Sequence, residues 1–272
     1  MAQIKIARSG SPDVEVWETL QKEAASLAQK EKALSSLLHT KILVQETFCR
    51  ALAGHLAESL STADLPALHL SKTIMSVYEE NPDAVEAAAR DLIAVYDRDP
   101  ACKTFIQAFL YFKGFLALQT HRIAHALYKD GRELLAFHLQ SRSSELYGVD
   151  INPAARIGSG IMFDHATGIV IGETAVVGDD CSILHGVTLG GTGKESEDRH
   201  PKIGERVMIG AGAKILGNIK IGDMARIAAG SVVLKDVPSK CTVAGVPAKA
   251  VGGPCCDNPA GAMSQTFDDN SK

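Results

Sequence analysis

Two acidic residues and one histidine in the second half of the chain have a spacing that could support acid–base chemistry. Asp150 lies upstream of His165, and Asp164 is the immediate neighbour of that histidine. A carboxylate beside an imidazole fixes the tautomer of the ring and raises its basicity. Such a pair could remove a proton from an alcohol, whose own pKa is far too high for unaided attack at neutral pH. Arg199 and His200 form a second polar pair further along the chain.

These residues lie in a segment that repeats with a strict period of six. Its aliphatic positions are Ile203, Ile209, Ile215, Ile221, Ile227 and Val233, and a small or aliphatic residue follows each of them four places on. A helix would need apolar residues every three to four positions, and a half-buried strand every two. A period of six is typical of a hexapeptide β-helix, in which three hexads form a triangular coil of about 18 residues. Because the separation of Asp150 from His165 is slightly less than one such coil, Asp150 is expected near His165 on the adjoining coil.

The repeat changes phase at two places. It slips by two residues around Ile169, and it is interrupted between Leu189 and Ile203, where a Gly-rich, charged stretch from 190 to 200 replaces the hexads. A repeat that departs from its own rule usually does so for function. The interruption therefore predicts an extruded loop that carries part of a site.

The first half of the chain reads as helical. Helix starts are predicted at Pro12 and Pro82, and two further helical patterns span about 103–128 and 131–146. The sequence thus predicts an α+β protein with an all-helical N-terminal domain at 1–148 and a parallel β-helix at 149–251. A flexible, Gly- and Pro-rich tail is expected at 252–272.

Composition excludes several classes of protein. The 272 residues are 46% hydrophobic with a net charge of −4 and no basic cluster, which argues against a nucleic-acid surface. No apolar run reaches membrane-spanning length, and the first eight residues lack the apolar core of a secretory signal. The six cysteines are scattered without a C-x-x-C pair, so free thiols and a cytoplasmic location are expected.

Two other sites are suggested less strongly. The run Gly190–Lys194 lacks the first glycine and the final Ser or Thr of a nucleotide phosphate loop. Three histidines of the repeat region, His165, His185 and His200, could hold zinc between subunits, as in γ-class carbonic anhydrases. A helical pair, His121 and His125, lacks the intervening Glu of a metalloprotease and is interpreted as packing or surface.

Several motifs together resemble bacterial serine O-acetyltransferases over nearly the whole chain. The matching runs are Val149–Gly158 at the domain junction, Asp164–Thr174 around the histidine, and Thr188–Lys194 with Asp198–Ile203 in the loop. The resemblance implies a left-handed β-helix and acetyl transfer from acetyl-CoA to the hydroxyl of L-serine, the first step of cysteine synthesis from serine. It implies no catalytic metal.

The resemblance also implies a role for each site residue. His165 would be the general base and Asp150 its orienting partner. Asp99 and Asp164 would bind the ammonium group of serine, and Arg199 its carboxylate, with His200 beside it. The acetyl-CoA would lie along the groove between adjacent solenoids, lined by Gly191, Ala211, Gly212 and Ala229, with Lys249 near the phosphates.

Assembly and regulation follow from the same resemblance. The family forms homotrimers through the solenoid, often paired into hexamers through the helical domain, and L-cysteine inhibits it at the serine site. Two departures stand out: Asn152 replaces a His, and the chain ends Asp269–Lys272 without the terminal Ile that docks into O-acetylserine sulfhydrylase. A complex with that sulfhydrylase is therefore not expected. An acetyltransferase for another small alcohol, a γ-class carbonic anhydrase and a solenoid without catalysis remain the alternatives.

Overall fold

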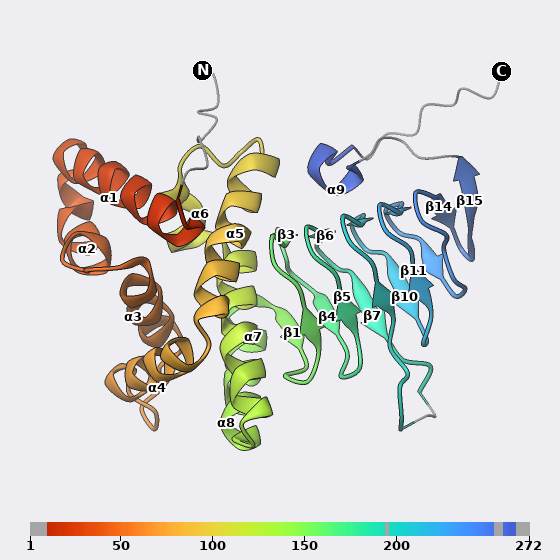
Figure 1. Cartoon of the computed structure of the whole chain (residues 1–272), viewed down its shortest axis with the longest axis horizontal. Helices are drawn as coiled ribbons and strands as arrows, with labels where there is room; N and C mark the ends of the chain where they lie inside the picture. The colour runs from red at the N-terminus through yellow and green to blue at the C-terminus, as the bar shows by residue number, and fades with distance from the viewer. Residues whose placement is uncertain (1–9, 194–195, 253–257, 265–272) are drawn as a thin grey trace.

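The computed structural model describes residues 10–193, 196–252 and 258–264 and has two parts (Figure 1). A cluster of helices forms the first part, and a solenoid of short strands forms the second. The last long helix ends at Tyr147 and the first strand begins at Val149. The predicted order of a helical region followed by a parallel β-helix is therefore confirmed.

The helical part buries its apolar faces in one continuous core. In α1, for example, Val16, Leu20 and Ala24 recur at helical spacing and are fully buried. The predicted starts at Pro12 and Pro82 are confirmed. The main helices are α1 (Pro12–Lys30), α2 (Ser35–Leu38), α3 (Phe48–Leu60), α4 (Ala67–Glu80), α5 (Pro82–Arg98), α6 (Phe105–Tyr111), α7 (Lys113–Lys129) and α8 (Glu133–Tyr147). Among the described residues, none of the helices is both long and apolar enough to cross a bilayer.

One expected helix is two helices. The pattern at 103–128 predicted a continuous helix, but the backbone is extended at Phe112, which separates α6 from α7. The new start brings Gly114 against the solenoid so closely that a Cβ there would lie 2.2 Å from the carbonyl oxygen of Phe163. Phe163 lies two residues before His165, so this approach is close to the corner that carries that histidine.

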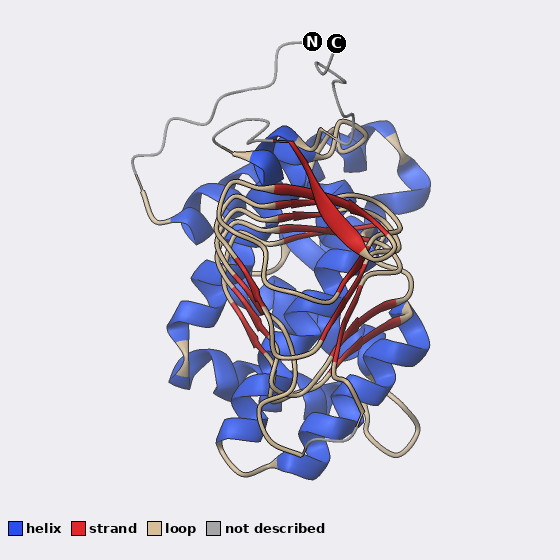
Figure 2. Cartoon of the chain, turned by 90° about the vertical axis from the view of Figure 1, so that its right-hand side faces the viewer, coloured by secondary structure: helices blue, strands red, loops and turns tan. Residues whose placement is uncertain are grey.

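The strands form three flat faces of a triangular solenoid (Figures 1 and 2). All neighbours pair in parallel except β14 and β15. The left-handed sense of the coil stays a prediction from the resemblance. Face A holds β1 (Val149–Ile151), β4 (Ile169–Ile171), β7 (Thr188–Gly190), β10 (Lys214–Leu216) and β13 (Val232–Val233). Face B holds β2 (Arg156–Ile157), β5 (Val176–Val177), β8 (Lys202–Ile203) and β11 (Lys220–Ile221). Face C holds β3 (Met162–Asp164), β6 (Ser182–Leu184), β9 (Met208–Ile209), β12 (Arg226–Ile227), β14 (Thr242–Gly245) and β15 (Ala248–Gly252).

Strand register locates both phase slips of the repeat. Asp164 pairs with Leu184, and Ile171 pairs with Leu189. The number of residues from Asp164 to its partner is larger by two than the number from Ile171 to its partner. The two extra residues lie between β3 and β4, where His165 and Ala166 both have positive φ, 54° and 60°. The second slip is larger, because Leu189 pairs with Ile215, which lies well beyond one coil further along the chain. The excess forms the extruded loop between β7 and β8.

Part of the expected flexible tail packs against the solenoid. A short helix, α9 (Pro259–Ala262), lies beside α5 and face C (Figure 1). The Ser182 hydroxyl donates to the Ala260 carbonyl at 2.9 Å, and Ala260 is fully buried. Burial of the small residues of α9 and the hydrogen bond to Ser182 fix the position of this helix. The Gly- and Pro-rich composition of the tail did not predict this packing. Residues 253–257 and 265–272 of the tail lie outside the described residues.

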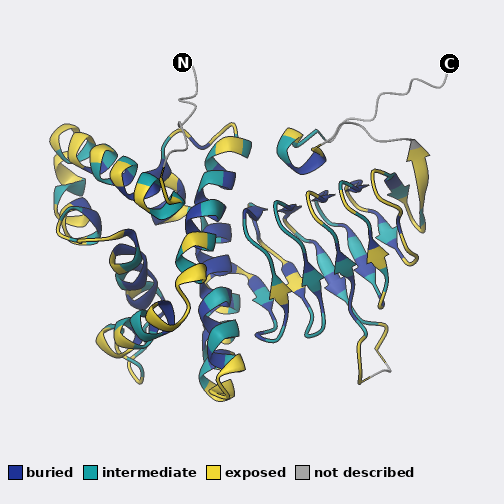
Figure 3. Cartoon of the chain, in the orientation of Figure 1, coloured by how far each residue is buried: buried dark blue, intermediate teal, exposed yellow. Residues whose placement is uncertain are grey.

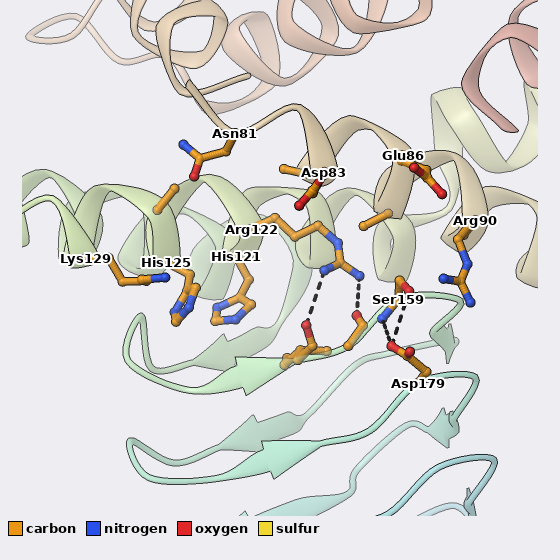
Figure 4. A pocket seen from close by; sticks show the side chains of 15 residues that line it. Asn81, Asp83, Glu86, Arg90, His121, Arg122, His125, Lys129, Ser159 and Asp179 are labelled. Atoms are coloured by element: carbon orange, nitrogen blue, oxygen red, sulfur yellow. Dashed lines mark hydrogen bonds between the residues drawn. The ribbon is translucent and has the colours of Figure 1, made fainter. Parts of the chain in front are cut away.

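One buried ion pair joins the two parts of the molecule. Asp91 on α5 is fully buried and accepts hydrogen bonds from Arg122 on α7, at 2.7 and 2.9 Å, and from the backbone N–H of Ile161, at 2.8 Å. Arg122 also donates to the carbonyls of Ile157 and Gly158 in the first coil (Figure 4). Buried residues, drawn dark blue in Figure 3, recur along α5, α7 and the first strands on both sides of this junction. The first coil is thus held against α5 and α7.

Candidate active site

The corner between faces C and A carries His165. Its backbone turns tightly, because the N–H of Ala166 donates to the Asp164 carbonyl and the N–H of Thr167 to the His165 carbonyl, at 2.6 and 2.7 Å. Two adjacent non-glycine residues with positive φ each cost about 1–3 kcal/mol. The turn leaves the His165 side chain 76% exposed. Single non-glycine residues with positive φ also occur at other corners of the coil, such as Asp180 and Arg206, but this corner has two in succession and presents an imidazole to the outside.

A pocket of about 420 Å³ opens beside this corner. It is lined by Asp99 at the end of α5, Lys113 at the start of α7, and Asp164, His165 and Thr167 from the corner. The Lys113 ammonium donates to the Thr167 hydroxyl. The fold therefore brings three residues predicted for the site, Asp99, Asp164 and His165, into one pocket, although Asp99 belongs to the helical part and is distant from the other two in sequence.

Asp150 lies close to the corner without contacting the imidazole. Among the described residues, no hydrogen bond or ion pair joins Asp150 to His165; the carboxylate nearest the ring is Asp164, with Oδ1 3.9 Å from Nε2. The Asp150 carboxylate instead accepts a 2.6 Å hydrogen bond from Gln140 on α8. The His165 ring also has the His185 ring beside it, with centroids 5.7 Å apart. The predicted Asp150–His165 pair therefore stays a proposal.

Arg199 and His200 lie at a different corner, between faces A and B. The Arg199 guanidinium pairs with Glu173 at 2.6 Å, and the His200 ring accepts from the backbone N–H of Thr174 at 3.2 Å. His200 is only 7% exposed, and burial together with the Arg199 charge lowers its pKa. Strand β4 separates this corner from His165. Within one chain, the predicted carboxylate clamp therefore does not reach the pocket.

Most residues predicted to bind CoA lie along the edge that starts at the His165 corner. Successive coils are joined there by hydrogen bonds of 2.8 Å, from Gly186 N–H to Thr167, from Gly212 N–H to His185 and from Gly230 N–H to Ala211. We call this line of residues, Thr167, His185, Ala211–Gly212 and Ala229–Gly230, the glycine edge. It contains the predicted Ala211, Gly212 and Ala229.

Two other predicted CoA residues have separate positions. Lys249 is exposed on β15 and pairs with Ala244, and the next residue, Gly245, donates its N–H to the Ser231 hydroxyl, beside Gly230 of the glycine edge, at 3.2 Å. Gly191 lies at the loop corner, where its backbone packs beside the Arg199 side chain. The structure thus groups Lys249 with the glycine edge and separates Gly191 from it.

The histidines do not form a metal site within one chain. His165 and His185 are neighbours, but His200 lies at the other corner, bonded to Thr174. The described part of the chain contains no cluster of three or more His, Cys, Asp or Glu side chains arranged around one point. The three histidines of the repeat region therefore do not share one position in the fold.

Another pocket, of about 460 Å³, lies away from the His165 corner, between α5, α7 and the first coil (Figure 4). His121 and His125 line it from α7, and His125 Nδ1 contacts the Pro153 carbonyl at 2.8 Å. Desolvation lowers the pKa of both rings and so favours their neutral form. Packing against the first coil agrees with the interpretation made from their spacing.

Two polar residues near the His165 corner, Lys113 and Gln140, were not predicted from the sequence. Lys113 reaches Thr167 and Gln140 reaches Asp150, and both stand on ordinary helical stretches without a motif. The Lys-Gly pair at 113–114 inside an apolar run was the only local irregularity that could have pointed to a helix break. Both contacts depend on how α7 and α8 pack against the solenoid.

Comparisons with known proteins give the same picture over nearly the whole chain. The family model described as "Serine acetyltransferase, N-terminal" matches residues 16–120, and "Bacterial transferase hexapeptide (six repeats)" matches residues 200–235. The serine acetyltransferase of Haemophilus influenzae is 51% identical over 93% of this chain and 95% of its own length. The crystal structure of serine acetyltransferase from Vibrio cholerae superposes with a TM-score of 0.93 at 52% identity, covering 94% of this chain and 99% of that one.

Related structures contain bound small molecules. A serine acetyltransferase in complex with cysteine has a TM-score of 0.92 at 51% identity, covering 93% of this chain and 99% of that one. The Brucella abortus enzyme in complex with coenzyme A has a TM-score of 0.87 at 53% identity, covering 89% and 96%. The Neisseria gonorrhoeae enzyme in complex with serine has a TM-score of 0.85 at 52% identity, covering 87% and 97%. These matches do not favour the carbonic anhydrase alternative. The chain belongs to the serine acetyltransferase family and is an enzyme that transfers an acetyl group from acetyl-CoA to the hydroxyl of serine.

Proposed function

We propose that acetyl transfer takes place in the pocket at the His165 corner. The observation that carries this proposal is the meeting of Asp99, Asp164 and His165 on one pocket wall. The two carboxylates suit the ammonium group of serine, and this leaves the serine hydroxyl beside the imidazole. The exposed His165 side chain is free to turn toward the hydroxyl.

In the proposed reaction His165 acts first as a base and then as an acid. Its ring takes the proton of the serine hydroxyl as the oxygen attacks the thioester carbonyl of acetyl-CoA. The tetrahedral intermediate collapses with cleavage of the C–S bond, and the imidazolium returns the proton to the CoA sulfur. The products are O-acetylserine and CoA. Lys113 and Gly114, the first residues of α7, line the same pocket. The Lys113 ammonium and the N-terminal end of the helix would supply positive potential for the developing oxyanion.

We also propose that a second copy of the chain completes the serine site. Arg199 and His200 lie at the corner between faces A and B, whereas the pocket lies at the corner between faces C and A. If triangular solenoids pack side by side around a threefold axis, the His165 corner of each copy would lie against the Arg199 corner of the next copy. The separation of the two corners within one chain supports the predicted homotrimer, with or without pairing of trimers through the helices.

The ligands of related enzymes support the remaining assignments. The complex with coenzyme A is consistent with acetyl-CoA lying along the glycine edge, with Lys249 near its phosphates. The complexes with serine and with cysteine support one site for both, since the two amino acids differ only in O versus S. L-Cysteine is thus proposed as a feedback inhibitor that competes with serine. A cytoplasmic location stays a prediction from the resemblance.

The proposal is tested by changing His165 to Ala. We expect kcat to fall at least ~100-fold, because the general base is lost. Serine-dependent release of CoA, followed by a thiol reagent, measures the rate. The control is His69→Ala, which removes an exposed histidine of α4 that does not line the pocket and should retain kcat within about threefold. If His165→Ala keeps more than a tenth of the wild-type kcat, the proposed base is wrong.

A further inference from the structure

The shortest side-chain contact made by Asp150 comes from a helix of the other domain. Gln140 Nε2 on α8 donates to Asp150 Oδ1 at 2.6 Å, and both side chains are half-buried. A hydrogen bond to a carboxylate of this length is charge-assisted and about twice as strong as a neutral one. Partial burial protects it from competition by water. The contact therefore fixes one oxygen of the carboxylate.

The local fold explains why these two residues meet. Helix α8 ends at Gly148, which has a left-handed backbone with φ 66°, and the chain turns at once into β1. In β1, Val149 and Ile151 point into the core, so Asp150 points outward beneath α8. On the same face of the helix as Gln140, the Ser143 hydroxyl contacts the Val149 carbonyl at 3.4 Å. The helix thus covers the outer side of the first strand.

This carboxylate lies one coil below the inserted corner. The carbonyl of Gly148 accepts from the N–H of Gly168 at 2.7 Å, and Asp150 pairs in register with Val170. The stretch that carries His165 therefore lies directly beside β1, in the next coil. Of the two partners, the carboxylate is held and the 76% exposed imidazole is free to turn.

We propose that Gln140 is a positioning residue for acetyl transfer: it holds Oδ1 of Asp150, so that the second oxygen remains available to orient the His165 ring. The inference rests on the proposed roles of His165 and Asp150 and adds a third member to that pair. Its effect passes entirely through Asp150, since Gln140 does not line the pocket beside His165. A purely structural role would instead be independent of the Asp150 carboxylate.

The first test is Gln140→Leu, which removes the donor and keeps a side chain of similar size. We expect kcat to fall about 10- to 100-fold, the usual loss for a residue that orients a reactive histidine system. KM for serine and for acetyl-CoA should change less than about twofold, because Gln140 contacts neither ligand. The matched control is Ser141→Leu, the next residue of α8, which is exposed and should leave kcat unchanged. Retention of more than half of the wild-type kcat by Gln140→Leu overturns the inference.

A double-mutant cycle separates positioning from structure. In an Asp150→Asn background, Gln140→Leu should change kcat less than twofold, because the group it acts through is already lost. An equal loss in both backgrounds would show that Gln140 supports the fold rather than the carboxylate. If Asp150→Asn alone leaves kcat unchanged while His165→Ala abolishes it, the reaction stands but the role of Gln140 is refuted.

A pH profile gives a signature that misfolding cannot imitate. The Glu in Gln140→Glu can donate to Asp150 only while it is protonated, and two carboxylates that share a site retain one proton most readily in acid. At pH 6 the kcat of Gln140→Glu should be higher than that of Gln140→Leu. By pH 9 the kcat of Gln140→Glu should fall to about that of Gln140→Leu. Parallel profiles for the two variants would contradict the inference. Loss of serine-dependent CoA release in the wild type would instead contradict the proposed function itself.

Discussion

Residue Asp91 shows how one side chain connects the two parts of the molecule. Its carboxylate is fully buried and is bonded to Arg122, to Gln119 and to the backbone of Ile161. Burial raises the pKa of Asp91, and the guanidinium of Arg122 acts against that rise. Because the guanidinium also binds two carbonyls of the first coil, the ion pair ties α5 and α7 to the solenoid.

Asp91→Ala should lower the free energy of unfolding by about 3–5 kcal/mol, because it leaves the Arg122 charge buried without its partner. Chemical denaturation of the full chain measures the effect. The matched control is Glu18→Ala, which breaks the exposed pair with Lys22 and should change stability by less than about 1 kcal/mol. Equal losses for the two variants would mean that the buried pair does not hold the domains together.

At the scale of elements, the start of α7 determines the shape of the His165 corner. The chain leaves helical geometry at Phe112 and restarts at Lys113, which reaches Thr167. The absence of a side chain at Gly114 lets the helix lie against the carbonyl of Phe163, two residues before His165. The strained turn at His165 is thus fixed by β3, which leads into it, and by α7, which packs against it.

Gly114→Ala should destabilise the protein by about 1–3 kcal/mol, because the added Cβ would lie 2.2 Å from backbone that cannot retreat easily. Gly54→Ala in α3 is the control, since a Cβ there meets nothing within 4 Å. It should stabilise by about 0.5–1 kcal/mol, the helix preference of Ala over Gly. Thermal and chemical unfolding measure the change in stability of both variants. If both variants are stabilised, the proposed close contact at Gly114 is wrong.

At the scale of the whole molecule, buried histidines make stability depend on pH. Burial lowers the pKa of His55 to about 4 and of His121 to about 3. The unfolded chain, with ordinary values near 6.5, binds more protons than the folded chain below that pH. Stability should therefore be complete above about pH 6.5 and decline as the pH falls toward 4. Glu23 and Asp91 act in the opposite sense, because burial raises their pKa.

His55→Gln should reduce this decline, since Gln does not titrate and can still donate to the Leu110 carbonyl that His55 contacts at 3.2 Å. The measurement is the difference in Tm between pH 7.5 and 4.5 for the wild type and the variant. The exposed His69→Gln serves as the control and should show the wild-type difference. A wild-type slope in His55→Gln would remove His55 as a cause of acid sensitivity.

Assembly can be tested with two inactive variants. If Arg199 of one copy completes the pocket of another, chains carrying His165→Ala and chains carrying Arg199→Ala should restore activity when refolded together. Random mixing would leave about a quarter of the sites intact. Activity no higher than the sum of the two separate variants would place both residues in sites of single chains. Refolding each variant alone provides the baseline.

The repeat of the second half could be read from sequence because it is local. A residue in a six-residue period has its direction set by its own place in the coil, so the aliphatic axis and the extruded loop both follow from spacing. The phase slip of two residues even marked the corner insertion at His165 and Ala166. The contacts of a helix with a distant strand have no such signature.

Tertiary packing decided everything that joins segments far apart in the chain. Asp99 entered the pocket because α5 lies against β3, and Gln140 met Asp150 because α8 covers β1. The break at Phe112 and the docking of α9 likewise depend on surfaces that a local pattern does not describe. Propensity is a weak prior that packing overrides, and the separation of Arg199 from His165 emerged only when the coil was closed.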